Sequence, residues 1–241
     1  MTQTIAELAA RKSVRAFMDR EIEPEKKALI LDAATQAPTA GNQQLYTIID
    51  VTSHEIKERL VLSCDNQPFI AKAGLVLVFC ADPLKWYDAF KYAGCDPREP
   101  GLGDLMLAVS DANIAAQNAV TAAWSLGIGS CYIGDIMENC ELQREILGLP
   151  EYVFPAAMLV FGYPTEQQSE REKPERCDMR HIVHENGYRR MDEGELRSML
   201  MKNVKSGTYD SWITAFCNRK YNSDFSVEMT RSVEAYLLQY K

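Results

Sequence analysis

The chain has 241 residues, a formal net charge of −8, 46% hydrophobic residues and 25% charged residues, which is ordinary usage for a soluble globular protein with one large core. The acidic balance argues against broad nucleic-acid binding, because affinity for phosphates needs a basic surface. No apolar signal-peptide core follows MTQTIAELAARK, and polar residues interrupt the longest apolar stretch, 105–128. We therefore expect neither a signal peptide nor a membrane span.

The first half of the chain alternates helical and strand patterns. A helix is expected over 4–11, and a second begins at Pro24 and stops before Pro38, where the small-polar run PTAGNQQ marks a loop. LYTIIDVT (45–52) is rich in β-formers and predicts a strand, and HEIKERLVL (54–62) predicts a helix. GLVLVFCA (74–81) is a nearly continuous apolar run, as expected for a strand buried on both faces.

A helix expected over 83–93 leads to GCDPREPGLG (94–103), whose glycines and prolines predict a loop. The longest helix is expected over 104–126. It is rich in alanine and lacks a clean polar stripe, so it is predicted to be buried on most sides. Packing against a second subunit would achieve that, and so would a central position in a monomeric core.

The second half continues with a short strand near 130–133, a helix over 139–147 and a strand over 155–162. The more polar remainder predicts helices near 192–202, 209–221 and 225–239. It has too few apolar runs for a second domain, so we expect a single domain over 1–241 in which 165–241 form an irregular and helical arm. Strands interspersed with helices indicate an α/β or α+β sheet flanked by helices.

Seven cysteines are scattered without a C-x-x-C pair, which predicts reduced thiols and a cytoplasmic protein. Neither the cysteines nor the three histidines cluster as zinc or iron–sulfur ligands do, so we expect no metal. His181 and His184 could share a helix face, but without a third ligand nearby they indicate surface residues.

Motifs of the common nucleotide and acyl-transfer enzymes are absent from the sequence. GIGSCYIG (127–134) has Tyr132 where a dinucleotide fingerprint needs its third glycine, and it leads into a strand instead of following one. No Walker A motif and no G-x-S-x-G elbow occurs. Tyr87 and Lys91 have the spacing of a short-chain dehydrogenase pair, but without the glycine fingerprint this is an ordinary helical spacing.

A basic cluster, RKSVR, stands near the N-terminus of this acidic chain. In an extended segment Arg11, Ser13 and Arg15 share one face. Two guanidiniums beside a hydroxyl suit a planar ligand with anionic or acceptor edges. A solvated charge run at the end of the first helix is the simpler alternative.

Several patches in a fixed order carry a family resemblance. RKSVR, APTAGNQQ (37–44), DANIAAQNAVTAAWSLGIGSCYIG (111–134), FGYP (161–164) and KPER (173–176) together resemble the FMN-dependent nitroreductase family over roughly 5–190. The resemblance implies an α+β fold with a central, mostly antiparallel sheet flanked by helices. It also implies an intertwined homodimer with FMN sites at the subunit interface.

The resemblance assigns residues to the cofactor in separate patches. The first patch meets the phosphate tail and pyrimidine edge, the small-polar loop reaches the flavin from the opposite subunit, and the strand end lies against the ring with the Gly134 backbone N–H near flavin N5. The late basic residues clamp the phosphate. The implied cofactor-binding residues are Arg11, Lys12, Ser13, Arg15, Pro38, Thr39, Ala40, Asn42, Gln67, Tyr132, Ile133, Gly134, Lys173 and Arg176.

The activity implied is that of an FMN-dependent NAD(P)H oxidoreductase that reduces nitroaromatics, quinones or similar electron-poor acceptors. NADH or NADPH would deliver hydride to flavin N5 in a ping-pong sequence, with no side chain required as acid or base. The partners expected are a small-molecule acceptor and a second copy of the chain. Three alternatives stay open: another reaction of the same family (reductive dehalogenation, flavin fragmentation or heterocycle dehydrogenation), a flavin-binding or storage protein with little turnover, and a globular interaction protein.

Overall fold

A computed structural model describes residues 1–240, and its centre is a four-stranded sheet in the order β1-β2-β4-β3. The strands are β1 (Tyr46–Asp50), β2 (Leu75–Ala81), β3 (Gly129–Ile133) and β4 (Phe154–Gly162). All three pairings are antiparallel, as expected from the sequence. Every residue of β2 and β4 is buried, which fits their apolar runs and their central positions in the sheet.

The chain divides into two compact units, Met1–Glu172 with the chain from Glu228 onward, and Lys173–Val227. The α-helices of the first unit are α1 (Gln3–Ala10), α2 (Pro24–Thr35), α3 (His54–Ser63), α4 (Leu84–Tyr92), α5 (Leu102–Ser125), α6 (Cys140–Leu147) and α7 (Glu166–Glu170). Its 3₁₀ turns are η1 (Ala40–Asn42), η2 (Gly134–Met137) and η5 (Leu238–Tyr240).

The second unit contains η3 (Met179–His181), α8 (Glu193–Leu200), η4 (Met201–Asn203) and α9 (Tyr209–Lys220). Helix α10 (Asp224–Leu237) begins in this unit and ends in the first. The interpretation of the whole chain as one domain with an arm over 165–241 stays a prediction, because a compact unit is not by itself an independent domain.

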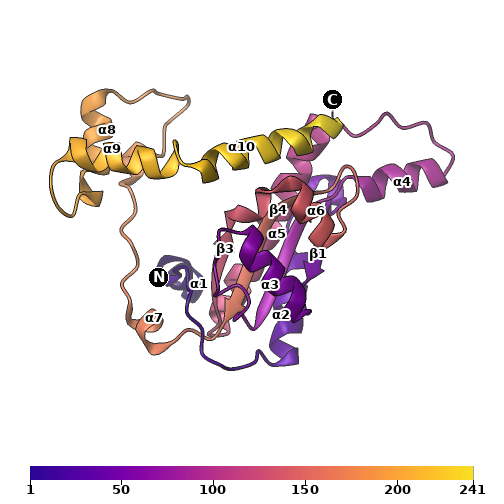
Figure 1. The fold of residues 1–241 in the computed structure, drawn as a ribbon, viewed down its shortest axis with the longest axis horizontal. Coiled ribbons are helices and arrows are strands. Elements are labelled where there is room, and N and C mark those ends of the chain that lie inside the picture. The colour runs from indigo at the N-terminus through magenta and orange to yellow at the C-terminus, as the bar shows by residue number, and fades with distance from the viewer. Residues whose placement is uncertain (241) are drawn as a thin grey trace. The chain divides into compact units, whose positions relative to one another are not determined.

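Two hydrophobic clusters fill the first unit, one on each face of the sheet. Alternate β2 residues such as Leu77 and Phe79 pack with α2 and α5 on one face. Their neighbours Val76 and Val78 pack with α3 and α6 on the other. The sheet therefore lies between two helical layers, and α5 runs along it (Figure 1).

Helix α5 is only partly buried within one chain. Its alanine-rich side packs on the sheet and on α2, with Ala112, Ala115 and Ala116 fully buried. Its other side leaves Met106, Leu107 and Ile114 exposed, Met106 by 64%. The expectation that α5 is buried on most sides therefore fails for the chain alone, because an apolar surface remains open.

Every strand and every helix predicted from the sequence is present, with ends that differ by a few residues. Helix α5 begins at Leu102 instead of Asp104, where Asp104 accepts a hydrogen bond from the Gly101 N–H at 2.8 Å. Helix α7 was not predicted, because five residues are too few to show a period. Across residues 1–240, no helix combines the length and apolarity needed to cross a membrane.

Candidate functional site

The basic cluster runs alongside β3 as an extended segment. Ser13 forms a parallel bridge with Ser130, and the Val14 N–H donates to the Ser130 carbonyl at 2.9 Å. The close approach needs a glycine in the strand, because a Cβ on Gly129 would lie 2.6 Å from Val14 Cγ2. Val14 is 1% exposed, so the alternation predicted for this segment holds and Arg15 lies on the open side.

Three side chains of the cluster act on the last residues of β3. Burial raises the pKa of the Cys131 thiol, while the Arg15 charge and hydrogen bonds from Arg15 and Ser13 oppose the shift. Burial raises the pKa of the Tyr132 phenol to about 12, and the charge of Arg11 opposes it. Ser13 and Arg15 therefore lie beside the strand, while Arg11, which lines a hollow with Glu7, Leu8, Thr121 and Trp124, acts on Tyr132 through its charge.

Gly134 directly follows β3 and is the first residue of η2. A Cβ added there would meet nothing within 4 Å, and its φ lies outside the left-handed region. Neither backbone conformation nor crowding by the described residues requires glycine at this position. The backbone is accordingly open to close approach by a ligand.

Gln67 reaches the same place from the turn after α3. Its Nε2 donates to Asp135 Oδ2 at 3.0 Å and to the Cys64 carbonyl at 2.9 Å. Asp135 directly follows Gly134, so the predicted residues of the first patch, Gln67 and the strand end are gathered at one edge of the sheet. Ile133 is 2% exposed and can contribute only through its backbone.

Lys12, which the resemblance also assigned to the cofactor, has other partners. It is 9% exposed, and its ammonium donates to the carbonyls of Ser169 and Arg171. Arg171 in turn donates to the Ser13 carbonyl at 2.6 Å. In this chain Lys12 therefore holds the segment after β4 against the basic cluster, and its contribution to a ligand stays a prediction.

The small-polar loop lies elsewhere, before β1. Asp111 of α5 organises it: its buried carboxylate accepts from the Thr39 hydroxyl, from the Ala40 N–H at 3.0 Å and from the Leu45 N–H at 3.2 Å. Asn42 is exposed with a φ of 57°, and Pro38 is exposed as well. Sequence reasoning missed Asp111, since nothing local marks it as a loop-binding residue.

One chain does not bring the loop and the basic cluster together. The loop leads into β1 and the cluster lies along β3, and these are the two edge strands of the sheet. At about 4.8 Å per strand the edges lie about 14 Å apart. Lys173 and Arg176 belong to the second unit, so their place at a phosphate stays a prediction.

The donors at the end of β3 fit a phosphorylated planar ring such as FMN. Two guanidiniums provide positive charge for a phosphate, or for the negative charge that a reduced flavin carries. The open Gly134 backbone allows contact with a ring face, and the Gln67 amide offers a hydrogen-bonding edge. The fold and these residues define an α+β protein with a binding site at one edge of its sheet.

Comparison with known proteins shows to which family the chain belongs. The sequence model described as "Nitroreductase family" matches residues 8–163. The chain is 30% identical over 98% of its length to an FMN reductase [NAD(P)H] of Bacillus subtilis, of which it covers 91%. It is 35% identical over 80% of its length to an oxygen-insensitive NADPH nitroreductase of Salmonella typhimurium, of which it covers 78%. The chain belongs to the nitroreductase family.

Solved structures agree on the fold. A Bacillus subtilis NfrA1 nitroreductase has a TM-score of 0.79 and 28% identity, covering 94% of this chain and 98% of that one. The NADPH:FMN oxidoreductase of Vibrio harveyi complexed with NAD⁺ has a TM-score of 0.82 and 25% identity, covering 98% of both chains. The α+β, nitroreductase-like fold expected from the sequence is thus confirmed.

Proposed function

We propose that this chain is an FMN-dependent NAD(P)H oxidoreductase that reduces nitroaromatics, quinones or similar electron-poor small molecules in the cytoplasm. The observation that carries the proposal is that Ser13 and Arg15 lie beside β3 and Gln67 bonds Asp135, next to the open backbone of Gly134, while the charge of Arg11 acts on Tyr132. The similarity to relatives named FMN reductase and NADPH nitroreductase supports it.

Each residue has a defined task in this proposal. The guanidiniums of Arg11 and Arg15 bind the phosphate or the acceptor edge of the ring and stabilise negative charge there. The Gly134 backbone lets the reactive part of the ring lie close to the strand end. When bound, FMN supplies the redox chemistry by accepting hydride at N5 from NADH or NADPH and passing electrons to the acceptor.

We further propose that the site is completed by a second copy of the chain in an intertwined homodimer. Thr39, Ala40 and Asn42 stand at the opposite sheet edge from the basic cluster, so they can join one ring only from a partner. The exposed apolar residues of α5, Met106 and Leu107 among them, offer a surface for that association. Lys173 and Arg176 would add positive charge for the phosphate.

A visible absorption spectrum tests the proposal directly. Purified protein is expected to be yellow with a flavin band that bleaches under anaerobic NADPH or NADH and returns when a quinone is added. A colourless protein that takes up no added FMN would contradict FMN dependence. If the protein is yellow but neither NADH nor NADPH bleaches its flavin band, the protein binds flavin without acting as this enzyme.

A further inference from the structure

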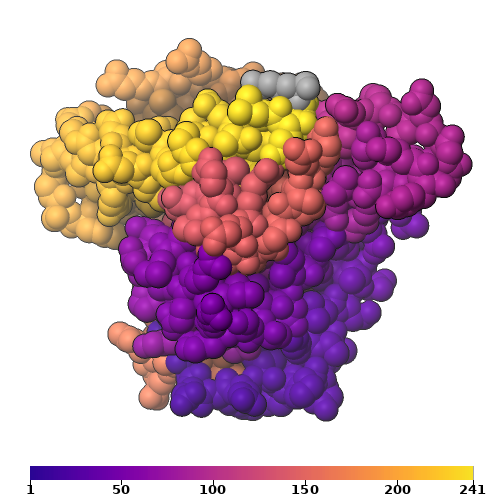
Figure 2. All heavy atoms as spheres, turned by 45° about the vertical axis from the view of Figure 1, so that its right-hand side comes forward, coloured from indigo at the N-terminus to yellow at the C-terminus, as the bar shows by residue number. Residues whose placement is uncertain are grey.

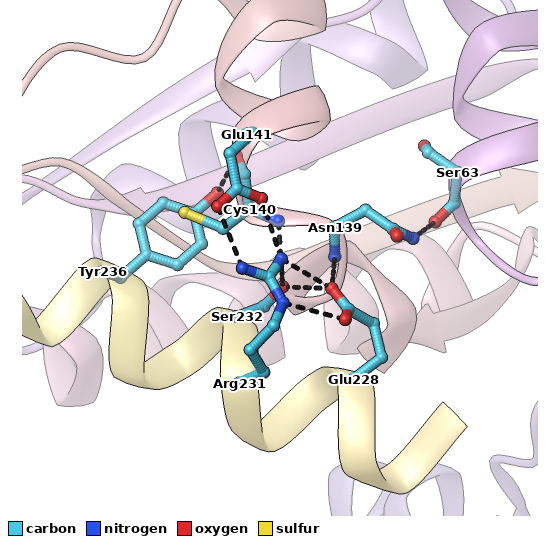
Figure 3. Close-up of polar contacts among 8 residues, drawn as sticks. All are labelled: Ser63, Asn139, Cys140, Glu141, Glu228, Arg231, Ser232 and Tyr236. Carbon is cyan, nitrogen blue, oxygen red and sulfur yellow. Dashed lines mark hydrogen bonds and ion pairs between the residues drawn. The ribbon is translucent and has the colours of Figure 1, made fainter. Parts of the chain in front are cut away.

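The segment after Gly134 is held by hydrogen bonds to two helices, α3 and α10. On one side Asn139 Nδ2 donates to the Ser63 carbonyl at the end of α3, at 3.0 Å. On the other side α10 caps the N-terminus of α6, because the Asn139 N–H donates to Glu228 Oε1 at 3.2 Å and the Cys140 N–H donates to Ser232 Oγ at 2.9 Å (Figure 3). Figure 2 shows the C-terminal residues, in yellow, lying against this part of the chain, in salmon.

Arg231 fixes the capping carboxylate. Its guanidinium donates to both Glu141 oxygens, at 2.9 and 2.8 Å, and to Glu228 Oε1 at 2.8 Å (Figure 3). The Ser63 carbonyl, the Glu228 carboxylate and the Ser232 hydroxyl therefore hold the start of α6 to α3 and α10. Residues 134–139 stand in a defined position relative to the turn that carries Gln67.

The orientation of the Gln67 amide is determined by its partners. Both are acceptors, the Cys64 carbonyl and the Asp135 carboxylate, so Nε2 must face them. Turning the amide over would place Oε1 against two oxygens. Oε1 itself accepts no hydrogen bond from residues 1–240, which leaves Gln67 with a free acceptor beside Gly134.

Glu138 supplies a second carboxyl group next to Asp135. Glu138 is 5% exposed, one of its oxygens is buried without a partner, and its side chain hydrogen-bonds Asp135. Burial, and then the negative charge of Asp135, raises the pKa of Glu138 to about 8. At neutral pH Glu138 is therefore protonated and donates to the Asp135 carboxylate, which stays an acceptor for Gln67.

We propose that Asp135, positioned by Glu138, fixes Gln67 as a hydrogen-bond acceptor, so that this site selects ring ligands that present an N–H at their edge. Asp135 and Glu138 are positioning residues that act through Gln67. The inference rests on the proposed function: the oxidised flavin ring carries a single N–H, at N3 of its pyrimidine edge. A ligand methylated at N3 offers no donor and leaves Oε1 unpaired.

The selection should weaken at alkaline pH, when Glu138 ionises and repels Asp135. The titratable groups that face Glu138 are Asp135 on η2, Asp65 and Cys64 at the end of α3, and Glu228 on α10. Glu138→Gln keeps a neutral donor toward Asp135 at every pH. This variant therefore distinguishes the effect of protonating Glu138 from the effect of packing its side chain.

The test compares the binding of FMN and 3-methyl-FMN to the flavin-free full-length protein by fluorescence quenching at pH 7. Wild type is expected to bind FMN at least about tenfold more tightly than the methylated form, the scale of one lost hydrogen bond to a desolvated acceptor. Asp135→Ala should reduce that ratio below about threefold, because Gln67 is then free to turn. Glu138→Gln should keep the ratio and hold it constant to pH 9, while the wild-type ratio falls.

Glu145→Gln is the control, because it removes a surface carboxylate that pairs with Arg59 and not with Gln67, and its ratio should equal that of wild type. If Asp135→Ala fails to fold by circular dichroism, Asp135→Val also removes the acceptor for Gln67 Nε2 and should still reduce the ratio. Equal wild-type affinities for FMN and 3-methyl-FMN, or an unchanged ratio in the folded Asp135 variants, would overturn the inference and leave the proposed function intact. Failure of wild type to bind FMN at all would instead overturn the proposed function.

Discussion

The two edges of the sheet illustrate two ways of building a site. At the β3 edge, a segment from the N-terminus, a turn after α3 and the strand end meet within one chain, held by Val14, Gly129 and the Gln67–Asp135 hydrogen bond. At the β1 edge, the loop before the strand is equally well ordered around Asp111, yet it faces none of those groups. Local order is therefore complete at both edges, while the proposed function assigns the second edge to the site of a partner chain.

The largest effect is expected from removing that partner. Met106→Glu places a charge on an α5 position that is 64% exposed in the single chain, so the fold of the chain should be unaffected. In a dimer interface the same charge would be buried without a partner. We predict conversion from dimer to monomer in analytical ultracentrifugation, with loss of bound FMN. A dimer that keeps its flavin would show that this face of α5 is not the interface.

Arg15→Ala should weaken FMN binding by about tenfold to a hundredfold, the range for one charge-assisted hydrogen bond. The flavin that remains should be harder to reduce, since a positive charge near the ring has been lost. Flavin affinity is measured by fluorescence quenching, and the potential by titration against a reference dye. Arg59→Ala is the control, because Arg59 pairs with Glu145 on the surface and should change neither quantity.

Substitution of two glycines at the β3 edge should have opposite consequences, one for stability and the other for FMN binding. Gly129→Ala forces a methyl group against Val14 and should destabilise the fold by about 1–3 kcal/mol, as overpacking does. A Cβ added at Gly134 meets nothing within 4 Å, so Gly134→Val should leave the free energy of unfolding nearly unchanged while lowering FMN affinity. Urea unfolding of the flavin-free proteins measures the first effect. Strong destabilisation by Gly134→Val would mean that this glycine serves the fold.

The last prediction concerns pH and stability. The pKa of Glu138 is raised from 4.5 to about 8, so between these values the folded state binds one proton more than the unfolded chain. Glu138 therefore lowers stability progressively as pH rises through that interval, and no further above it. Glu138→Gln should gain Tm over wild type increasingly from pH 5 to pH 8. A Tm difference independent of pH would show that Glu138 does not titrate in this way.

The fold was largely predictable because its signals are local. The uninterrupted apolar run of β2 indicates a doubly buried strand, and the alternation of Arg11, Ser13 and Arg15 around Val14 indicates an extended segment with one polar face. The site was predictable only in part. The same alternation predicts that Lys12 lies on the inner face. It does not predict the hydrogen-bond partners of the buried ammonium, which are two carbonyls of the segment that packs there after β4.

Asp111, Asp135 and Glu138 could not be predicted, because their roles depend on residues far away in the sequence. Asp111 accepts a hydrogen bond from Ala40, which lies 71 residues earlier in the sequence. Gln67 and Asp135, which also form a hydrogen bond, are 68 residues apart. An acidic residue in a helix or turn is normally solvated, so the sequence alone favours that interpretation. Only the topology of the sheet, which brings the end of α3 to the end of β3, turns these carboxylates into positioning groups.

The measurement that tests the two-chain site most directly is flavin content in a mixed dimer. Arg15→Ala and Asn42→Asp are made in separate chains with different affinity tags, and the mixed dimer is isolated. Because each site would take Arg15 from one chain and Asn42 from the other, one site contains both defects and the other contains none. We predict that the mixed dimer binds about one FMN for two chains while each parent homodimer binds little. A mixed dimer as empty as its parents would contradict the account.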